Sequence, residues 1–124
     1  MLIKRTILSI GYSLLLLLSY NSSKAMMLDI IKTKLQITVL NNLGNIEKGA
    51  TIQLFKTEED YEQSVNAIQT KVTDDKGKAT FDNLEERDYY VLVEKGDMSN
   101  TDGGTKTEKL KAHRINKITI IISE

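Results

Sequence analysis

The sequence predicts a β-sandwich of six or seven short antiparallel strands, and three observations support this prediction. Apolar and polar residues alternate with a period of two, turn-forming residues separate the alternating runs, and no long segment has the 3.6-residue spacing of an amphipathic helix. Short strands at this spacing are typical of sandwiches. The predicted strands are residues 34–42, 50–55, 67–73, 78–81, 89–94 and 115–123, with residues 104–110 as a candidate seventh.

The apolar positions of each run indicate the buried face, because successive side chains of a strand point to opposite faces. The inward-facing sets are Leu35, Ile37 and Val39; Ala50, Ile52 and Leu54; Ile68 and Val72; and Ile118, Ile120 and Ile122. The isoleucine-rich run at 118–122 predicts a buried central strand. Service as a donor strand to a neighbouring molecule is the alternative.

One segment interrupts this series of strands. Residues 57–64, TEEDYEQS, begin with Thr57, a suitable N-cap, and continue with acidic residues that the dipole of a first helical turn favours. We therefore expect a short helical insertion there. Turns are expected at residues 41–45, 74–77 and 95–97.

The first 25 residues have the order of a secretory signal peptide. Lys4 and Arg5 precede an apolar run at residues 7–18, and residues 23–25, Ser-Lys-Ala, provide a small-x-small cleavage signal. The apolar run is shorter than the ~20 residues of a membrane-spanning helix. We expect cleavage after Ala25 and export of residues 26–124 as one domain, secreted or periplasmic, without stable membrane insertion. An uncleaved anchor is the alternative.

Composition excludes some partners and attachments. The chain has no cysteine, which rules out a lipidated N-terminal cysteine and any disulfide. It carries 17 basic and 17 acidic residues, and loss of Lys4, Arg5 and Lys24 with the leader leaves 14 basic ones, a net charge of about −3. This mild acidity is not the footprint of a nucleic-acid-binding domain, so we expect no nucleic-acid partner.

A set of residues between about 35 and 123 resembles the carboxypeptidase regulatory-like domains. The matching residues are Gly44, Gly49, Ala50, Thr51, Ile52, Gln53, Leu54, Thr73, Asp74, Gly77, Ala79, Thr80, Phe81, Leu84, Tyr89, Val91 and Val93. Such domains have the prealbumin-like (transthyretin-like) Greek-key sandwich and are related to the Cna-B domains of surface proteins. The resemblance implies a domain without catalysis or cofactor, of the kind that accompanies peptidases, outer-membrane receptors or adhesins.

The matched residues have physical roles in turns and core. Gly49 and Ala50 let the chain enter a strand without bulk, while Asp74 accepts turn amides and Gly77 takes a positive φ. The ring of Tyr89 is expected in the core, with its hydroxyl bonded to backbone as in a tyrosine corner. Phe81 and Leu84 fill the same core. The chain departs from the family pattern in having no proline and in having Arg87 where a glycine commonly precedes the tyrosine.

Asp74 and Asp75 are candidates for a metal site or a catalytic carboxylate pair, as well as for a plain turn. A calcium loop needs six or more oxygens from spaced ligands, and a glycosidase needs two carboxyls facing each other across a substrate. Here the two acids are adjacent, with Lys76 and Lys78 close by. The turn is favoured, so we expect no metal ligand and no catalytic carboxylate.

His113, the only histidine, is the candidate for a hydrolase. A triad needs a nucleophile and an orienting acid, and none of Ser64, Ser99 and Ser123 has a nucleophile-elbow context. Transthyretin-like enzymes that hydrolyse hydroxyisourate use several histidines and end in Tyr-Arg-Gly-Ser, whereas this chain ends in Ile-Ile-Ser-Glu. We expect no enzyme activity.

The order Lys34, Glu94, Asn116 invites comparison with the Lys–Asn isopeptide crosslink of Cna-B domains. Strand alternation argues against a crosslink, because Leu35 faces inward and Lys34 should then face solvent. We expect no crosslink.

Two charged segments and one loop form the candidate interaction surface. The acidic residues 58–62 and the basic segment 106–117 either bind partners or are solvated edges that oppose aggregation. The loop at 95–105 is either a binding loop or a simple connection. The candidate residues are Tyr61, Met98, Asn100, Asp102, Lys109, Lys111 and Arg114. We expect an unidentified envelope protein or surface glycan as partner, with a carbohydrate-binding module using Tyr61 as the alternative; the oligomeric state is left open.

Overall fold

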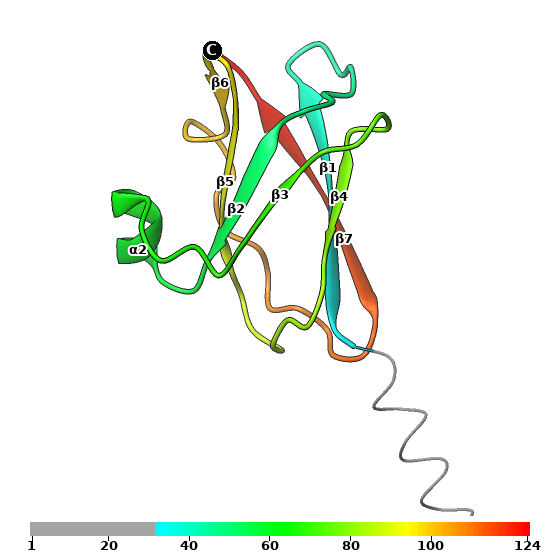
Figure 1. Cartoon of the computed structure of the whole chain (residues 1–124), viewed down its shortest axis with the longest axis vertical. Helices are drawn as coiled ribbons and strands as arrows, with labels where there is room; N and C mark the ends of the chain where they lie inside the picture. Colours follow the sequence, from blue (N-terminus) through cyan, green and yellow to red (C-terminus); the bar gives the residue numbers. More distant parts are fainter. Residues whose placement is uncertain (1–31) are drawn as a thin grey trace, which may run out of the picture. The chain divides into compact units, whose positions relative to one another are not determined.

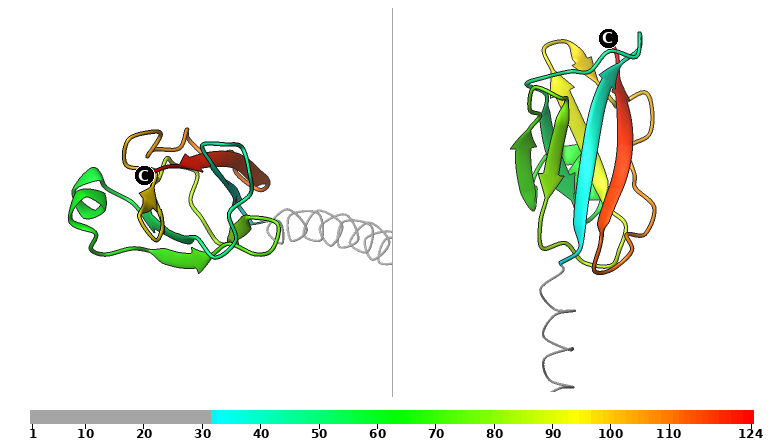
Figure 2. Two further views of the ribbon diagram at one scale, coloured as in Figure 1. Left: turned by 90° about the horizontal axis from the view of Figure 1, so that it is seen from above. Right: turned by 90° about the vertical axis from the view of Figure 1, so that its right-hand side faces the viewer.

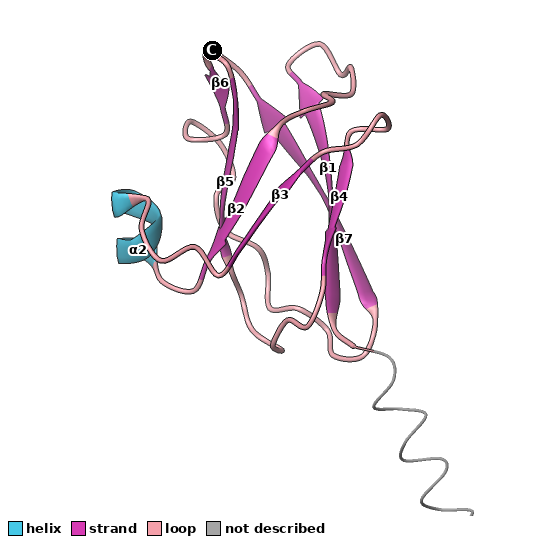
Figure 3. Ribbon diagram, in the orientation of Figure 1, coloured by secondary structure: helices cyan, strands magenta, loops and turns pink. Residues whose placement is uncertain are grey.

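Two β-sheets pack face to face around an apolar core (Figures 1 and 3). One sheet has the strand order β4-β1-β7 and the other the order β3-β2-β5-β6. The structure is a computed structural model that describes residues 32–124, which form one compact unit, and the predicted signal peptide lies outside them. The elements are β1 (Lys34–Asn41), β2 (Thr51–Phe55), α2 (Glu58–Gln63), β3 (Gln69–Val72), β4 (Lys78–Phe81), β5 (Tyr90–Lys95), β6 (Met98–Ser99) and β7 (Ile115–Ile122). The predicted β-sandwich with a short helical insertion is confirmed.

Alternating residues of both sheets fill the core. The buried cluster consists of Leu35, Ile37, Val39, Ala50, Ile52, Leu54, Ala79, Phe81, Leu84, Tyr89, Val91, Val93, Leu110, Ile120 and Ile122, with Met98 and Ile118 packed against it. Tyr89 buries its ring, and its hydroxyl oxygen accepts a hydrogen bond from the backbone N–H of Glu85 at 2.8 Å. This bond secures the turn that leads into β5.

The helix α2 starts where the sequence predicts. The Thr57 hydroxyl accepts a hydrogen bond from the backbone N–H of Asp60 at 3.1 Å, and Glu58, Glu59 and Asp60 occupy the first turn. The helix ends at Ser64, which adopts the left-handed conformation. No helix within residues 32–124 has the length and apolarity to cross a membrane.

The pairing of β1 with β7 is parallel, whereas the sequence predicted antiparallel strands throughout. Its register runs from Lys34 opposite Ile115 to Asn41 opposite Ile122. The other strand pairs are antiparallel. Parallel neighbours need a long connection between them, and here almost the whole domain lies between the two strands. Side-chain alternation is the same in both directions, so the pattern could not reveal this pairing.

The strand β7 is an edge strand, not the buried central strand predicted. In its three-stranded sheet β1 holds the central place. Ile118, Ile120 and Ile122 face the core as predicted, but Ile121 is 58% exposed. Isoleucine occupies both faces of this strand, and such a run has the pattern of a buried strand even where one face meets solvent.

The seventh strand forms at residues 98–99 and not at residues 104–110. The later stretch makes only an isolated bridge between Tyr90 and Lys106. Two backbone bonds flank that bridge, from Val91 N–H to the Thr105 carbonyl (2.7 Å) and from Thr107 N–H to the Tyr89 carbonyl (2.9 Å). The chain then leaves the edge of β5, so no strand propagates.

Ile68 and Val72 were predicted to point inward, and both are exposed; Val72 has 59% of its surface open. They flank or belong to β3, the edge strand of a four-stranded sheet that faces a sheet of only three strands. The register with β2 gives the reason, because residues directly opposite each other share a face: Val72 lies opposite exposed Thr51, whereas Lys71 lies opposite buried Ile52. The alternation of this segment was therefore a correct sign of a strand, but it indicated the wrong face.

Candidate functional site

Asp74 closes the connection between β3 and β4 through its own carboxylate. Its Oδ1 accepts hydrogen bonds from the backbone N–H groups of Lys76 and Lys78, each at 2.9 Å. The Gly77 N–H donates to the Asp74 carbonyl at 2.9 Å, and Gly77 has a φ of +73°. Amide donation, chiefly from Lys78, holds the pKa of Asp74 below its ordinary value because it favours the charged form. The carboxylate is thus committed to the turn.

Asp75, the adjacent acid, takes part in a surface ion pair. Its Oδ1 lies 2.7 Å from Lys48 Nζ, and its side chain is 84% exposed. Within residues 32–124, no three His, Cys, Asp or Glu side chains are grouped so that they could hold a metal ion. The two aspartates therefore serve separate local contacts.

His113 lies just before β7 with a φ of +56°, and its backbone N–H donates to the Thr33 hydroxyl at 3.0 Å. Ser99 and Ser123 pair through their backbones beyond the other end of β7. Ser64 is the C-cap of α2. The structure thus places the three serines on other parts of the fold than the histidine.

Lys34, Glu94 and Asn116 do not form the arrangement that an isopeptide crosslink requires. Lys34 Nζ pairs with Asp82 Oδ1 at 3.2 Å, and Glu94 is exposed on a strand of the other sheet. The Asn116 amide donates to the carbonyls of Lys34 (3.1 Å) and Lys111 (3.0 Å), and its Oδ1 accepts from the Lys111 N–H at 2.9 Å. Asn116 therefore fastens the chain before β7 to the strand itself.

Asn100 was predicted on the interaction surface, and this prediction is wrong. The residue is only 1% exposed. Its Oδ1 accepts from the Val93 N–H at 2.9 Å, and its Nδ2 donates to the carbonyls of Val91 (2.8 Å) and Gly104 (3.2 Å). The side chain substitutes for a strand beside β5, where the chain leaves β6.

Asn100 belongs to a stretch that crosses from one sheet to the other, residues 99–111, which we call the crossing segment. Thr107 Oγ1 accepts from the Tyr89 N–H at 3.0 Å, and Leu110 is buried in the core. Met98, also proposed for the surface, is half-buried against the core, whereas Asp102 is exposed. The crossing segment is thus an anchored connection rather than a loose loop.

Tyr61, on α2, is part of a small aromatic cluster and not a free surface ring. Its ring centroid lies 6.0 Å from that of Phe55, edge to face, and 6.2 Å from that of Tyr90. Lys106 Nζ lies 5.4 Å from the centre of the Tyr90 ring and 3.0 Å from Asp88 Oδ2. Partial burial raises the pKa of the Tyr61 hydroxyl. The Tyr61 ring is thus partly exposed and packs against two other rings.

A groove runs along the outer edge of β7, between that strand and the crossing segment; we call it the β7 groove. Figure 2 shows the crossing segment, in orange, beside the red strand in both views. Three adjoining hollows of about 350, 300 and 370 Å³ form it. Ile118 lines the first two, and Thr119 and Ile120 line the last two, so the hollows follow the strand in order.

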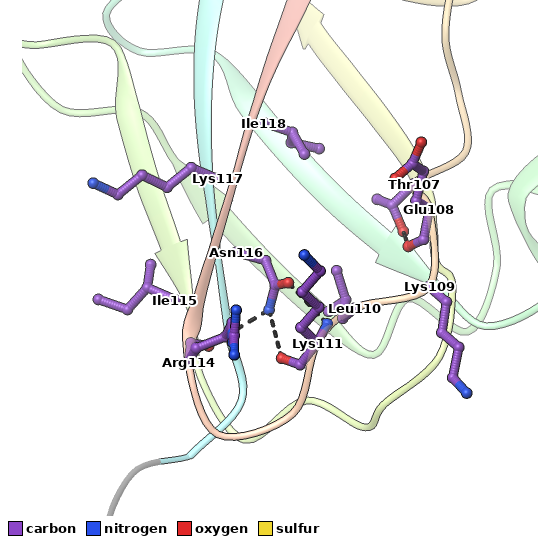
Figure 4. Close-up of a pocket in the computed structure, with 10 residues that line it drawn as sticks. All are labelled: Thr107, Glu108, Lys109, Leu110, Lys111, Arg114, Ile115, Asn116, Lys117 and Ile118. Atoms are coloured by element: carbon purple, nitrogen blue, oxygen red, sulfur yellow. Dashed lines mark hydrogen bonds between the residues drawn. The ribbon is translucent and has the colours of Figure 1, made fainter.

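Four basic residues line the end of the β7 groove where β7 begins, and Figure 4 shows the side chains of Lys109 and Lys117 extending away from it on opposite sides. Lys109, Lys111, Arg114 and Lys117 line this end together with a single acid, Glu108. All four basic residues are exposed, and none makes an ion pair within residues 32–124. The lysines that do make ion pairs are Lys34, Lys48, Lys56, Lys95 and Lys106. Three of the predicted surface residues, Lys109, Lys111 and Arg114, therefore line the same end of the groove.

The acidic segment, residues 58–62, does not line the β7 groove. Residues 58–62 are on and around α2, which packs beside β2 and β5 on the side of the molecule away from β7 (Figures 1 and 2). Among the described residues no ion pair joins the two segments, which approach each other only where Lys106 lies over the Tyr90 ring that packs against Tyr61.

Comparison with known proteins supports the fold. No family model matches the sequence, and no curated protein was found to match it. A streptococcal ancillary pilin matches with a TM-score of 0.57 and 19% identity, over 76% of this chain and 33% of that one. The major pilin subunit of Bacillus cereus matches with a TM-score of 0.50 and 20% identity, over 75% and 30%. The TIE protein of Bacillus anthracis has a TM-score of 0.47 and 21% identity, over 73% and 16%.

This chain spans about a third of the length of the two pilins that it matches. At such identities the likeness shows the fold alone, a pilin-type sandwich that agrees with the resemblance to Cna-B and prealbumin-like domains.

Sequence reasoning found the basic residues of the β7 groove but missed the groove itself. Its wall includes Thr119 and Ile120, for which the sequence predicts a buried central strand, and Gly104, which begins the predicted seventh strand. The available signal was Lys117, because a charge inside an isoleucine run is a mark of an edge strand.

Proposed function

We propose that this chain is an exported, non-catalytic domain that supports a surface or envelope assembly by binding a protein partner. The observation that carries the proposal is the β7 groove, where an edge strand of eight residues borders exposed and unpaired basic side chains. Extended partners commonly bind at sheet edges, where backbone groups supply affinity and neighbouring side chains supply specificity.

Two further observations support this role. Two solved structures that share the sandwich, at TM-scores of 0.57 and 0.50, are pilins. The order of residues 1–25 is that of a leader for export. Because one fold serves many functions, the groove and not the likeness is the stronger argument.

The glycan-binding alternative has weaker support. Sugar binding by stacking needs exposed aromatic faces, and Tyr61 packs against Phe55 and Tyr90. A hydrolase would need a nucleophile near His113, and the serines lie elsewhere.

Binding of the purified protein to isolated envelopes of its own cells tests the proposal. We expect the cells to export the chain, and the mass of the exported protein should correspond to a first residue near Met26. We also expect saturable binding to the envelopes. Proteinase treatment of the envelopes should abolish binding, whereas periodate oxidation of their glycans should leave it unchanged. Retention of the chain in the cytoplasm, or absence of saturable binding, would contradict the proposal. Loss of binding after periodate alone would support the glycan alternative.

A further inference from the structure

We propose that the β7 groove binds an extended, C-terminally acidic segment of a partner protein, which joins the sheet as a strand antiparallel to β7. This inference rests on the proposed function and names the chemistry of the partner. Three features carry it: the unpaired backbone of β7, the direction set by β6, and the distribution of charge along the groove.

The hydrogen bonds at the two ends of β7 show which backbone groups face outward. The Lys34 N–H donates to the Arg114 carbonyl, so residue 114 faces β1. Ser123 exchanges both of its backbone bonds with Ser99, each at 3.0 Å, so residue 123 faces away from β1. Facing alternates along a strand, and the register with β1 is unbroken. The N–H and C=O groups of Ile115, Lys117, Thr119 and Ile121 therefore face the groove, and within residues 32–124 no strand lies beside them.

Length and composition make β7 unlike the other edge strands of the described chain. The edge strands β3 and β4 have four residues each and β6 has two, whereas β7 has eight. Proteins blunt their edges with short strands and charges, and a long apolar edge is a template for another chain. Lys117 is the only charged residue in β7. Exposed Ile115 and Ile121 would pair with apolar side chains of an added strand.

The bridge from β6 to β7 sets the direction of the added strand. Ser99 lies beside Ser123 in antiparallel orientation, at the site where a strand next to β7 would begin. The chain turns away from β7 at Asn100. The position beside the preceding residues of β7 is therefore left without a strand. A segment that continues the line of Ser99 runs antiparallel to β7, so its C-terminal end reaches the start of β7.

Charge favours the same direction. The start of β7 lies among Lys109, Lys111, Arg114 and Lys117, with Glu108 as the only acid among the lining residues. The other end of the groove has Asp102 and no basic residue among those that line it. Acidic side chains and a terminal carboxylate of the segment would neutralise the basic residues at the start of β7. A segment that runs parallel to β7 would instead bring its amino-terminal end to these basic residues.

A single extended segment fits this site better than the sheet edge of a second copy. The edge of β7 is bordered on its far side by the crossing segment, which lines all three hollows. A lone strand enters such a groove, with alternate side chains toward Ile118 and Ile120, whereas a folded sheet would meet the crossing segment first.

A synthetic peptide tests the proposal directly. The probe is fluorescein-labelled Val-Val-Thr-Val-Glu-Ser-Val-Asp with a free carboxyl terminus, which places acids toward Lys117 and Arg114 in the antiparallel register. Titration of the purified protein should give a saturable rise in fluorescence anisotropy. The same peptide with its sequence reversed should bind about tenfold more weakly or less. Equal binding of the two peptides, or binding by neither, overturns the proposal.

Hydrogen exchange reports where the peptide binds. Peptide addition should slow the exchange of the Thr119 and Ile121 amides, which face the groove, more than that of the Ile118 and Ile120 amides, which face β1. Protection confined to other strands overturns the proposal.

Two pairs of variants separate edge pairing from general effects. Thr119→Pro removes an outward N–H and should abolish peptide binding; its control is Thr70→Pro on β3. The Thr73 N–H donates to the carbonyl of Ala50, the residue before β2, so by alternation the Thr70 N–H faces away from β2, as the Thr119 N–H faces away from β1. Prolines at such edge positions do not remove a ladder bond. Full peptide binding by folded Thr119→Pro overturns the proposal.

The second pair tests charge and does not depend on tolerance of proline. Lys111→Glu with Arg114→Glu should weaken peptide binding at least about tenfold, while Lys71→Glu with Lys76→Glu, an equal change of net charge elsewhere, should not. Equal effects of the two charge reversals contradict the proposal.

The oligomeric state provides a further test. If sedimentation velocity shows that the protein is a dimer and that Thr119→Pro makes it a monomer, the proposal is contradicted, because a second copy of the chain then pairs with the edge of β7. Envelope binding without peptide binding removes this inference and leaves the proposed function intact. Peptide binding without envelope binding removes the proposed function and leaves the peptide-binding groove intact.

Discussion

The two flanks of the sandwich, where the chain passes from one sheet to the other, are closed in different ways. On the β3–β4 flank a turn makes the passage, and Asp74 secures it with bonds to residues two and four positions away. On the β6–β7 flank the crossing segment makes the passage, and Asn100 and Thr107 secure it with bonds to β5 and to the residue before it. Local bonds hold the first passage, although β3 and β4 both remain edge strands. Side-chain anchors hold the second passage as a connection over the gap, beside the longer unpaired edge of β7.

The largest expected effect comes from removing an anchor of the β6–β7 flank. Asn100→Ala leaves the Val93 N–H and the Val91 carbonyl without their partner in the interior, and should lower the free energy of unfolding by about 3 kcal/mol. Urea unfolding followed by circular dichroism measures this loss. Asp102→Ala, an exposed change on the same segment, should stay within about 0.5 kcal/mol of the wild type. Comparable losses in the two variants would mean that Asn100 is not an anchor.

The contrast between the flanks also explains what the sequence could reveal. The turn at Asp74, the N-cap at Thr57 and the inward faces of β1 and β2 depend on residues close in sequence, and all are present as expected. Asn100 lies in a run of polar residues and glycines that suggests a solvated loop. Its role depends on backbone groups of β5 that only the folded chain brings to it.

The direction and position of β7 are also long-range properties. They depend on its pairing with β1, about 80 residues away in the chain. The candidate site was therefore predictable as a set of basic residues but not as a groove.

A smaller loss is expected on the β3–β4 flank from Thr73, whose hydroxyl is buried. Its Oγ1 accepts from the Ala50 N–H at 2.9 Å and donates to the Glu47 carbonyl at 2.6 Å. Thr73→Val keeps the shape and removes both bonds, and should cost about 2 kcal/mol in urea unfolding. Thr73→Ser keeps the hydroxyl and should cost less. If the two variants unfold together, the loss comes from packing and not from the bonds.

Glycine substitutions measure how tightly the same flank is closed. Gly77 has a φ of +73°, and a Cβ there would lie 3.1 Å from both the Val39 carbonyl oxygen and the Ile46 Cβ. Gly44 has a φ of +83° and nothing within 4 Å of such a Cβ. Both alanine variants pay the cost of a left-handed conformation, about 1 kcal/mol. Gly77→Ala should therefore show the larger fall in melting temperature, and equal falls would mean that the turn yields to the extra atom.

The smallest effect is expected from Asp74 itself, and its dependence on pH identifies it. Because amide donation lowers the pKa of the folded-state carboxyl, its contribution to stability is present above the unfolded pKa of about 3.9 and is lost as pH falls through the lower folded value. Asp74→Asn should lower the melting temperature by a few degrees at pH 7. The difference from the wild type should shrink as pH falls below about 4. Asp75→Asn is the matched control, because exposed ion pairs such as Asp75–Lys48 contribute little. A difference between wild type and Asp74→Asn that stays constant down to low pH would show that the charge of the carboxylate does not secure the turn. Closure of this flank would then depend on the long-range bonds of Thr73 and on the close contact at Gly77.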